Sequence, residues 1–235
     1  MSACAVSVMG LLQRRSRYFR CLRRPEQIGR MHRCFHRLTC EWIELAGAEL
    51  GFAPAWLTCT EADALYDALL TGVAWEVHRI RMFGREIDSP RLSCWIGEPG
   101  AAYTYSRTRF EPHPWLPVLR PIRTRLRDTL GIDFNSVLAN RYRDGRDAMG
   151  WHSDDEPELG PRPVIASLSL GATRRFGLKS RDEGGGRLAL DLPHGSLLVM
   201  GGETQTRYRH ALPRTARPVG ERINLTFRLI GFSNG

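Results

Sequence analysis

Three residues of this sequence could together hold a metal ion. His152 and Asp154 lie two positions apart, and residues i and i+2 of an extended strand point to the same face. His210 lies well downstream, so it would reach the pair from a different strand. Two imidazoles and one carboxylate that leave coordination positions open form a donor set that suits non-haem iron(II). The sequence therefore predicts a metal site at these three residues.

A second group of polar residues lies in the segment 222–228. Its even positions are Arg222, Asn224, Thr226 and Arg228, whereas its odd positions are apolar. In a strand this alternation places the polar groups on one face and the apolar groups on the other. The polar face could lie in solvent. It could instead line the interior of a barrel, where two guanidinium groups would hold a small dianion, because guanidinium binds carboxylates through paired hydrogen bonds.

Two neutral donors upstream favour the interior placement. Asn140 and Tyr142 are again two positions apart, so they would share one face of a strand that leads toward His152. The implied ligand is a dicarboxylate held beside the metal.

These residues need a scaffold, and the sequence predicts an α+β fold. Thr58 and Glu61 form a capping-box pattern ahead of a helix over 58–71. A second apolar helical stripe runs from 116 to 130, and Gly131 suits its end. Both helices should pack on a sheet. From 134 onward short extended segments dominate, at 134–143, 163–170, 174–178, 187–190, 196–200, 204–211 and 221–230. Many short strands with Gly, Pro and Asp between them indicate a jelly roll.

The net charge of +9 is concentrated at one end of the chain. Residues 1–40 hold nine Arg and one acid, Glu26, whereas the other 195 residues hold 25 bases and 24 acids. We expect 1–40 to be a disordered basic leader and 41–235 to form one domain, with its metal core at about 134–232. The leader could also be an organellar presequence, a phosphate-binding arm, or an over-long start ahead of Met31.

Composition bears on whether the chain enters a membrane and on the redox compartment it suits. No apolar run approaches the roughly 18 residues of a membrane-spanning helix, so we expect no membrane association. Six cysteines without a Cys-x-x-Cys pattern or an export signal favour free thiols in a reducing compartment. We expect a monomer in the cytoplasm of a bacterium or the nucleus of a eukaryote, with organellar import left open.

Several motifs together resemble one known family. The combination of Asn140-Arg-Tyr142, His152-Ser-Asp154, His210 and Arg222-x-Asn-Leu-Thr-Phe-Arg228 is similar to the AlkB family of Fe(II)/2-oxoglutarate dioxygenases, which repair alkylated nucleic acid bases. Trp151-His-Ser-Asp-Asp-Glu-Pro, Ile165-Ala-Ser-Leu-Ser-Leu-Gly-Ala-Thr-Arg and Tyr103-Thr-Tyr-Ser106 look most like the animal branches that act on DNA and RNA. The resemblance covers about residues 50–232.

The resemblance implies a double-stranded β-helix, the jelly-roll core of that family, and a reaction. Iron would be held by His152, Asp154 and His210. The co-substrate 2-oxoglutarate would be held by Asn140, Tyr142, Arg222, Asn224 and Arg228. With O₂, the enzyme would demethylate 1-methyladenine and 3-methylcytosine in DNA and in RNA, releasing succinate, CO₂ and formaldehyde. This would be direct-reversal repair of DNA damage.

The resemblance also implies substrate contacts. A methylated base must leave the stack to reach a buried metal, and a flipped base is held between flat side chains. Trp75, Tyr103 and Tyr105 match positions that line the base pocket, with Tyr105 expected to stack opposite His152. Asp155 resembles the acid that hydrogen-bonds the damaged base. The alternative is that the aromatic residues belong to the core and that Asp155 is a solvated loop acid.

Two other functions fit some of these features. One is a hydroxylase of the same fold that acts on a protein or a small molecule. The other is a non-catalytic nucleic-acid-binding module with a degenerate site, against which the complete set of metal-binding residues argues. Turnover of 2-oxoglutarate without binding of methylated oligonucleotides would favour the first, and activity that survives His152→Ala would favour the second.

The segment Arg81-Met-Phe-Gly-Arg85 yields a prediction about strand preference. Phe83 at a turn between two arginines resembles a wedge that enters a duplex while the arginines bind phosphates. Phe83→Ala should therefore reduce repair of methylated duplex DNA more than repair of the same single strand. Formaldehyde release from matched oligonucleotides measures both, and equal losses on the two substrates would refute the wedge.

Overall fold

The computed structural model describes residues 40–82, 85–105 and 108–231, without side-chain placements at 79–87 and 103–110. The expected disorder of the leader therefore lies outside the described residues, apart from Cys40. In the described part the helices are α1 (Cys59–Gly72), α2 (Leu119–Leu130) and α3 (Thr204–Arg207), with a 3₁₀ turn at Pro157–Leu159. None of the described helices has the length and apolar character needed to span a membrane.

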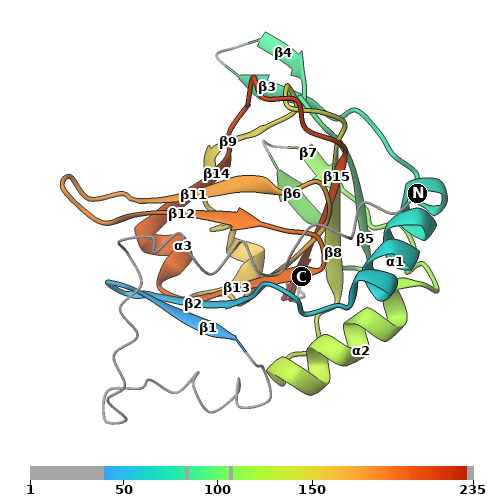
Figure 1. The fold of residues 1–235 in the computed structure, drawn as a ribbon, viewed down its shortest axis with the longest axis horizontal. Helices are drawn as coiled ribbons and strands as arrows, with labels where there is room; N and C mark the ends of the chain where they lie inside the picture. The colour runs from blue at the N-terminus through green and yellow to red at the C-terminus, as the bar shows by residue number, and fades with distance from the viewer. Residues whose placement is uncertain (1–39, 83–84, 106–107, 232–235) are drawn as a thin grey trace.

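The strands form two larger sheets and two hairpins (Figure 1). The first sheet has the order β1 (Glu41–Leu45), β2 (Ala48–Ala53), β13 (Ser196–Gly202), β10 (Ile165–Gly171), β15 (Arg222–Arg228), β8 (Ser136–Tyr142) and β5 (Leu92–Gly97). The second has the order β12 (Arg187–Leu192), β11 (Arg174–Ser180), β14 (Tyr208–Leu212) and β9 (Met149–His152). The hairpins are β3 (Arg79–Met82) with β4 (Arg85–Asp88), and β6 (Tyr103–Tyr105) with β7 (Thr108–Phe110).

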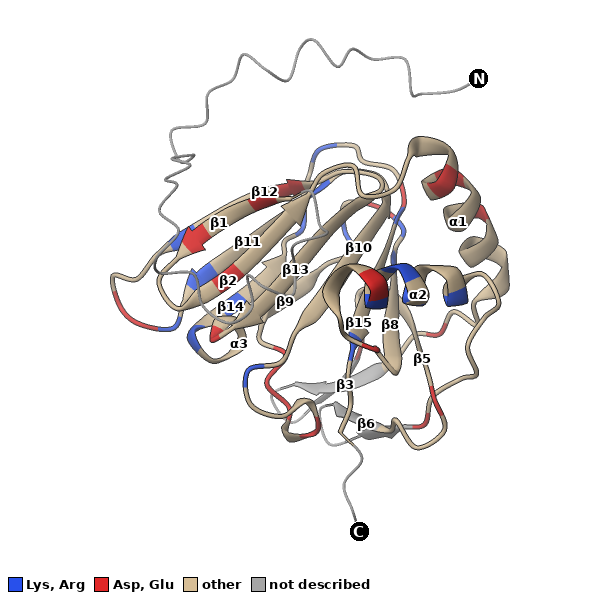
Figure 2. Ribbon diagram, turned by 90° about the horizontal axis from the view of Figure 1, so that it is seen from below, with Lys and Arg blue, Asp and Glu red and all other residues tan. Residues whose placement is uncertain are grey.

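The predicted α+β jelly roll is confirmed, because two antiparallel sheets face each other and helices cover one outer face. Figure 2 shows α1 and α2 on one side of the seven-stranded sheet and β11, β12 and β14 on the other. Each face of that sheet is buried in its own apolar layer. The helix side is packed by residues such as Leu65, Leu126 and Leu168, and the inter-sheet side by residues such as Leu198 and Phe176.

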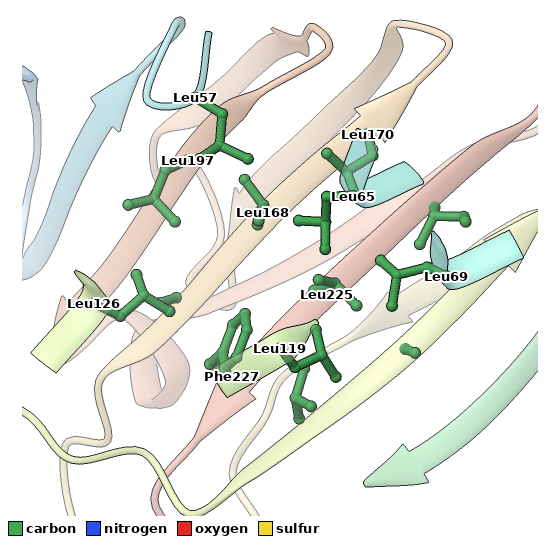
Figure 3. Packing of buried hydrophobic residues seen from close by; sticks show 14 of the residues in the cluster. Leu57, Leu65, Leu69, Leu119, Leu126, Leu168, Leu170, Leu197, Leu225 and Phe227 are labelled. Atoms are coloured by element: carbon green, nitrogen blue, oxygen red, sulfur yellow. The ribbon is translucent and has the colours of Figure 1, made fainter. Parts of the chain in front are cut away.

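The two long helices begin and end where the sequence indicates. Thr58 caps α1, since its side chain accepts from the amide of Glu61 while the Glu61 carboxylate accepts from the amide of Thr58. Gly131 ends α2 with a φ of 69°, a left-handed conformation that glycine adopts without strain. Leucines of both helices meet Leu225 and Phe227 of β15 in the core (Figure 3). The apolar face of β15 is therefore covered by helices, and its polar face must point between the sheets.

Two local expectations were incomplete or wrong. Strands β1 and β2, which extend the large sheet, were not predicted. The segment 204–211 was expected to be extended, but Thr204–Arg207 forms the single turn α3. The turn is stabilised locally, because the Thr204 hydroxyl donates to the carbonyl of Gly201 and the amide of Arg207 donates to the carbonyl of Glu203. Only the strand after it, β14, is extended.

The covered core gives a stability prediction. Leu126 is fully buried between α2 and the sheet, so Leu126→Ala should lower the free energy of unfolding by about 2–5 kcal/mol. Leu229, which is 49% exposed, is the matched control, and Leu229→Ala should change the free energy by less than about 0.5 kcal/mol. Urea unfolding measures both values. Equal effects of the two substitutions would contradict the packing described.

Candidate active site

Strands β9 and β14 bring the predicted metal-binding residues together. His152 ends β9 and is the cross-strand partner of His210 on β14, and the two imidazole centroids are 4.2 Å apart. Asp154 follows β9 directly, with its Oδ1 3.7 Å from His152 Nε2. One donor atom from each of the three residues lies within 4.8 Å of the other two. The i and i+2 spacing has thus placed both side chains at one point, and His210 does arrive from a neighbouring strand.

Burial sets the charge of these groups. Burial lowers the pKa of the His152 imidazole, and it lowers that of His210 to about 3, so both imidazoles are neutral near pH 7. Burial alone would raise the pKa of Asp154, but Arg228 and the two imidazoles more than offset it and hold that pKa below its usual range. A neutral imidazole lone pair and an ionised carboxylate are the forms that bind metal ions. All three residues therefore present usable donors.

Neighbouring groups orient each donor. The carbonyl of Gly150 lies 2.9 Å from His152 Nδ1, and a proton on Nδ1 donating to it leaves the Nε2 lone pair facing Asp154 and His210. Phe176 stacks on His210 with ring centroids 5.4 Å apart. The amide of Asp154 donates to Gln205 Oε1 at 3.0 Å. Gln205 on α3 was not anticipated, because a glutamine 51 residues away carries no local signal.

The polar face of β15 lines the same cavity, which has a volume of about 50 Å³. Its lining includes all eight residues that the sequence assigned to the metal and the dianion: six on β8, β9 and β15, together with Asp154 after β9 and His210 on β14. The register between β15 and β8 brings these residues together, since Arg222 pairs with Tyr142 and Asn224 pairs with Asn140. The solvent-facing alternative for Arg222–Arg228 is wrong, because all seven residues of the strand are buried.

Arg222 is a buried cation with an unsatisfied hydrogen-bond donor. Its side chain is buried, its Nη2 donates to Ser169 Oγ at 2.9 Å, and its guanidinium carbon lies 5.3 Å from the Tyr142 ring centroid. Among the described residues no carboxylate pairs with it, and its buried Nε has no hydrogen-bond partner. Burial lowers the pKa of Arg222 to about 10, so it stays charged near pH 7. A buried, unneutralised guanidinium is costly unless an anion binds it.

Arg228 and the amide groups are already engaged. Arg228 Nη2 lies 2.9 Å from Asp154 Oδ1, so this arginine sits at the metal end of the cavity. Asn224 Nδ2 donates to Ser167 Oγ and to the carbonyl of Leu168, and its Oδ1 accepts from Thr226. Asn224 therefore lines the cavity with its side-chain amide already held by hydrogen bonds to the protein. Asn140 Oδ1 accepts from Arg91 Nε at 2.6 Å.

Arg91 is a buried cation of this cavity that sequence analysis missed. It precedes β5 and is 6% exposed, and its Nη1 donates to Ser89 Oγ. Its signal in the sequence is weak, because one arginine after a proline resembles any loop residue. Only the pairing of β5 with β8 brings it to Asn140.

The predicted substrate residues fare differently. Trp75 does not line the cavity. It packs against the helix-side core, donates from Nε1 to the carbonyl of Leu70 at 3.3 Å, and lies beside Arg141. The end of α1 therefore holds the partly buried indole against the core, and contact of Trp75 with a substrate base stays a prediction. Phe83 and the side chains of Tyr103 and Tyr105 lie outside the described residues.

Asp155 is exposed and is not among the residues that line the cavity. Its carboxylate forms an ion pair with Arg181, which also donates to Ser153 Oγ at 2.8 Å. Ser153 Oγ in turn donates to the carbonyl of Tyr208 at 2.7 Å. The loop that carries Asp154 is therefore tied to both β11 and β14, and the contact of Asp155 with a base stays a prediction.

The donor set fits iron(II), and the remaining lining fits a dicarboxylate. Two neutral imidazoles and one carboxylate leave open positions around a metal. Arg222 and Arg228 approach the cavity from opposite ends of β15, as an anion with two carboxylates requires. The sites for metal and anion adjoin, so both ligands would be held side by side.

Known proteins are similar to this chain in sequence. The family model described as the 2OG-Fe(II) oxygenase superfamily matches residues 49–228. The rat protein named alpha-ketoglutarate-dependent dioxygenase alkB homolog 3 is 43% identical over 189 residues, which are 75% of this chain and 62% of the relative. The mouse DNA oxidative demethylase ALKBH2 is 41% identical over 203 residues, which are 82% of this chain and 80% of the relative.

Solved structures confirm the fold. The structure titled OsALKBH1 superposes with a TM-score of 0.55 at 18% identity, covering 81% of this chain and 99% of that one. A 2OG-Fe(II) oxygenase family oxidoreductase from Burkholderia pseudomallei superposes with a TM-score of 0.51 at 17% identity, covering 79% and 87%. The chain spans about 62% of the length of the rat relative. By sequence match and identity, the chain belongs to the AlkB family of 2OG-Fe(II) oxygenases.

Proposed function

We propose that this protein is an iron(II)- and 2-oxoglutarate-dependent dioxygenase that demethylates N-alkylated bases, such as 1-methyladenine and 3-methylcytosine, in DNA. The observation that carries the proposal is the buried Arg222, with an unpaired Nε, in the same cavity as the His152, Asp154 and His210 cluster. The name of the mouse relative, DNA oxidative demethylase ALKBH2, supports the choice of substrate.

The protein residues supply binding and orientation. His152, Asp154 and His210 would hold the iron. Iron and 2-oxoglutarate, when bound, supply the oxidising chemistry that consumes O₂, turns 2-oxoglutarate into succinate and CO₂, and releases the substrate methyl group as formaldehyde. The buried lining keeps bulk water from the reacting groups, and the hydrogen bonds to Asp154 and His152 hold their donor atoms in place.

The two arginines divide the recognition of 2-oxoglutarate. Arg228 contacts Asp154, so it would meet the carboxylate nearer the metal. Arg222, anchored on Ser169 and beside Tyr142, would bind the other carboxylate through its unpaired Nε and its Nη atoms. Asn140 and Tyr142 line the space between them.

The finer parts of the proposal concern RNA, assembly and location. We propose that RNA is a further substrate and that the protein is a monomer. We also propose that it is located in the cytoplasm of a bacterium or in the nucleus of a eukaryote. The RNA part is supported by the motif Trp151-His-Ser-Asp-Asp-Glu-Pro, which resembles the branches of the family that act on DNA and RNA. Sedimentation of the full chain tests the monomer, and methylated RNA beside DNA tests the substrate range.

Demethylation itself is tested by formaldehyde release from a 1-methyladenine oligonucleotide with iron(II) and 2-oxoglutarate. His152→Ala should reduce release by more than about 100-fold, since losing a ligand costs at least as much as losing its supporting hydrogen bond. His113→Ala, at an exposed histidine, should retain full activity. A chelator should abolish release, and added iron should restore it. Metal-independent release, or full activity of His152→Ala, would disprove the assignment.

Co-substrate binding is tested at Arg222. Arg222→Lys keeps the charge but removes the Nε donor and the paired geometry, so the KM for 2-oxoglutarate should rise about 10–100-fold. The value of kcat at saturating 2-oxoglutarate should change less. Arg175→Lys, at an exposed ion pair with Asp191, is the matched control and should leave KM unchanged. An unchanged KM in Arg222→Lys would show that the dianion binds elsewhere.

A further inference from the structure

The outer face of the four-stranded sheet carries an exposed aromatic ring. Residues of β9, β11, β12 and β14 alternate between the cavity and solvent, so Trp151, beside the inward His152, points outward. Trp151 is 48% exposed, which is unusual for the largest apolar side chain. A solvated tryptophan on a rigid strand is a feature that binding surfaces use.

Trp151 lies across the sheet rather than projecting from it. Strand β14 separates β9 from β11, yet the ring of Trp151 reaches Gly177 on β11. A Cβ at position 177 would lie 3.1 Å from Cη2 of the ring, so glycine permits this close approach. The tip of the indole is thus in contact with the sheet at Gly177, while about half of the side-chain surface stays exposed to solvent.

Three cations form a row next to this ring. Lys179 on β11 is the direct cross-strand partner of both Arg187 on β12 and Arg209 on β14. Like charges in directly opposed positions destabilise a sheet. In the described part of the chain none of the three forms an ion pair with a carboxylate, and Lys179 Nζ lies 4.4 Å from the Trp151 ring centroid. By contrast, Arg175 on the same face is paired with Asp191.

A half-exposed aromatic ring beside cations without carboxylate partners is a combination that binds single-stranded nucleic acid. Bases of any identity stack on the ring, and cations follow the phosphates. Strand β9 is the edge of its sheet and carries both His152 and Trp151, so the outer face adjoins the active site at this edge. Nucleotides that flank a base in the active site can pass around this edge.

We propose that the outer face of the β12–β11–β14–β9 sheet binds single-stranded nucleic acid, with one base stacked on Trp151 and phosphates on Arg187, Lys179 and Arg209. We call these four residues the outer-face site. This inference rests on the proposed function, because it identifies where the flanking strand of that substrate is held. This site would bind the nucleic acid strand independently of its base sequence and outside the active-site cavity.

Binding to an unmethylated single-stranded oligothymidylate of about 15 nucleotides tests the site, with the full chain and fluorescence anisotropy over a range of salt concentrations. Trp151→Ala should weaken binding by about tenfold, whereas Trp151→Phe should retain most of the affinity. The triple variant Lys179→Gln, Arg187→Gln, Arg209→Gln should lower the salt slope of log K by about two, because each phosphate contact contributes about 0.7 on a single strand.

Controls separate this site from general charge and from the cavity. Arg175→Gln removes a cation of the same face that Asp191 already neutralises, so it should leave affinity and salt slope unchanged. The Arg-rich leader is present in every variant and cannot cause a difference. Formaldehyde release from a methylated mononucleotide, which has no flanking nucleotides to occupy the outer face, should be the same in Trp151→Ala and the parent protein.

Each other outcome overturns the inference. Unchanged affinity in Trp151→Ala together with an unchanged slope in the triple variant would remove the site. If Arg175→Gln weakened oligothymidylate binding as much as the triple variant does, the binding would reflect the overall charge of the sheet rather than a specific site. If Trp151→Ala also lowered turnover of the methylated mononucleotide by a matching factor, the substitution would be acting through the neighbouring His152. If the substitutions weakened the binding of a duplex of equal length more than the binding of the single strand, the outer face would be assigned to double-stranded DNA instead. Absence of turnover in the parent protein would reject the proposed function alone, since oligothymidylate binding is measured independently.

Discussion

The pairing of β9 with β14 is the contact on which the active site depends. It sets His152 opposite His210, and the residue two positions on, Asp154, completes the cluster. The position of Asp154 is then held by three groups from outside β9, which are Gln205, Arg228 and, through Ser153, Tyr208. Strand pairing thus decides which side chains meet, and buried hydrogen bonds decide how precisely they meet.

Charge balance in the cavity follows from the same arrangement. Arg91, Arg222 and Arg228 are buried in its lining, whereas Asp154 is the one buried acid among its lining residues. Isolated charges are costly to bury, so an excess of buried cations indicates a missing anion. The apolar layers on both faces of the seven-stranded sheet keep this lining rigid. Stability and ligand recognition are therefore coupled through one sheet.

Most of the site could be predicted because strands repeat with period two. The alternation in Arg222–Arg228 identified four polar groups that share a face, and the spacing of Asn140 with Tyr142 and of His152 with Asp154 did the same. The helices were equally readable, since Thr58 with Glu61 and Gly131 are local signals. By contrast, Gln205 and Arg91 reach the site only through long-range packing, which no local pattern of the sequence reports.

By itself the sequence determined the type of donors, their grouping into strand faces, and the order in which they occur. Tertiary structure decided which face is inside. For β15 the helices α1 and α2 cover the apolar side, so the arginines turn toward the cavity. For β9 the pairing with β14 turns His152 inward, and Trp151 is consequently laid across the outside on Gly177. Periodicity defines two faces of a strand, but only the neighbours in the folded chain distinguish core from solvent.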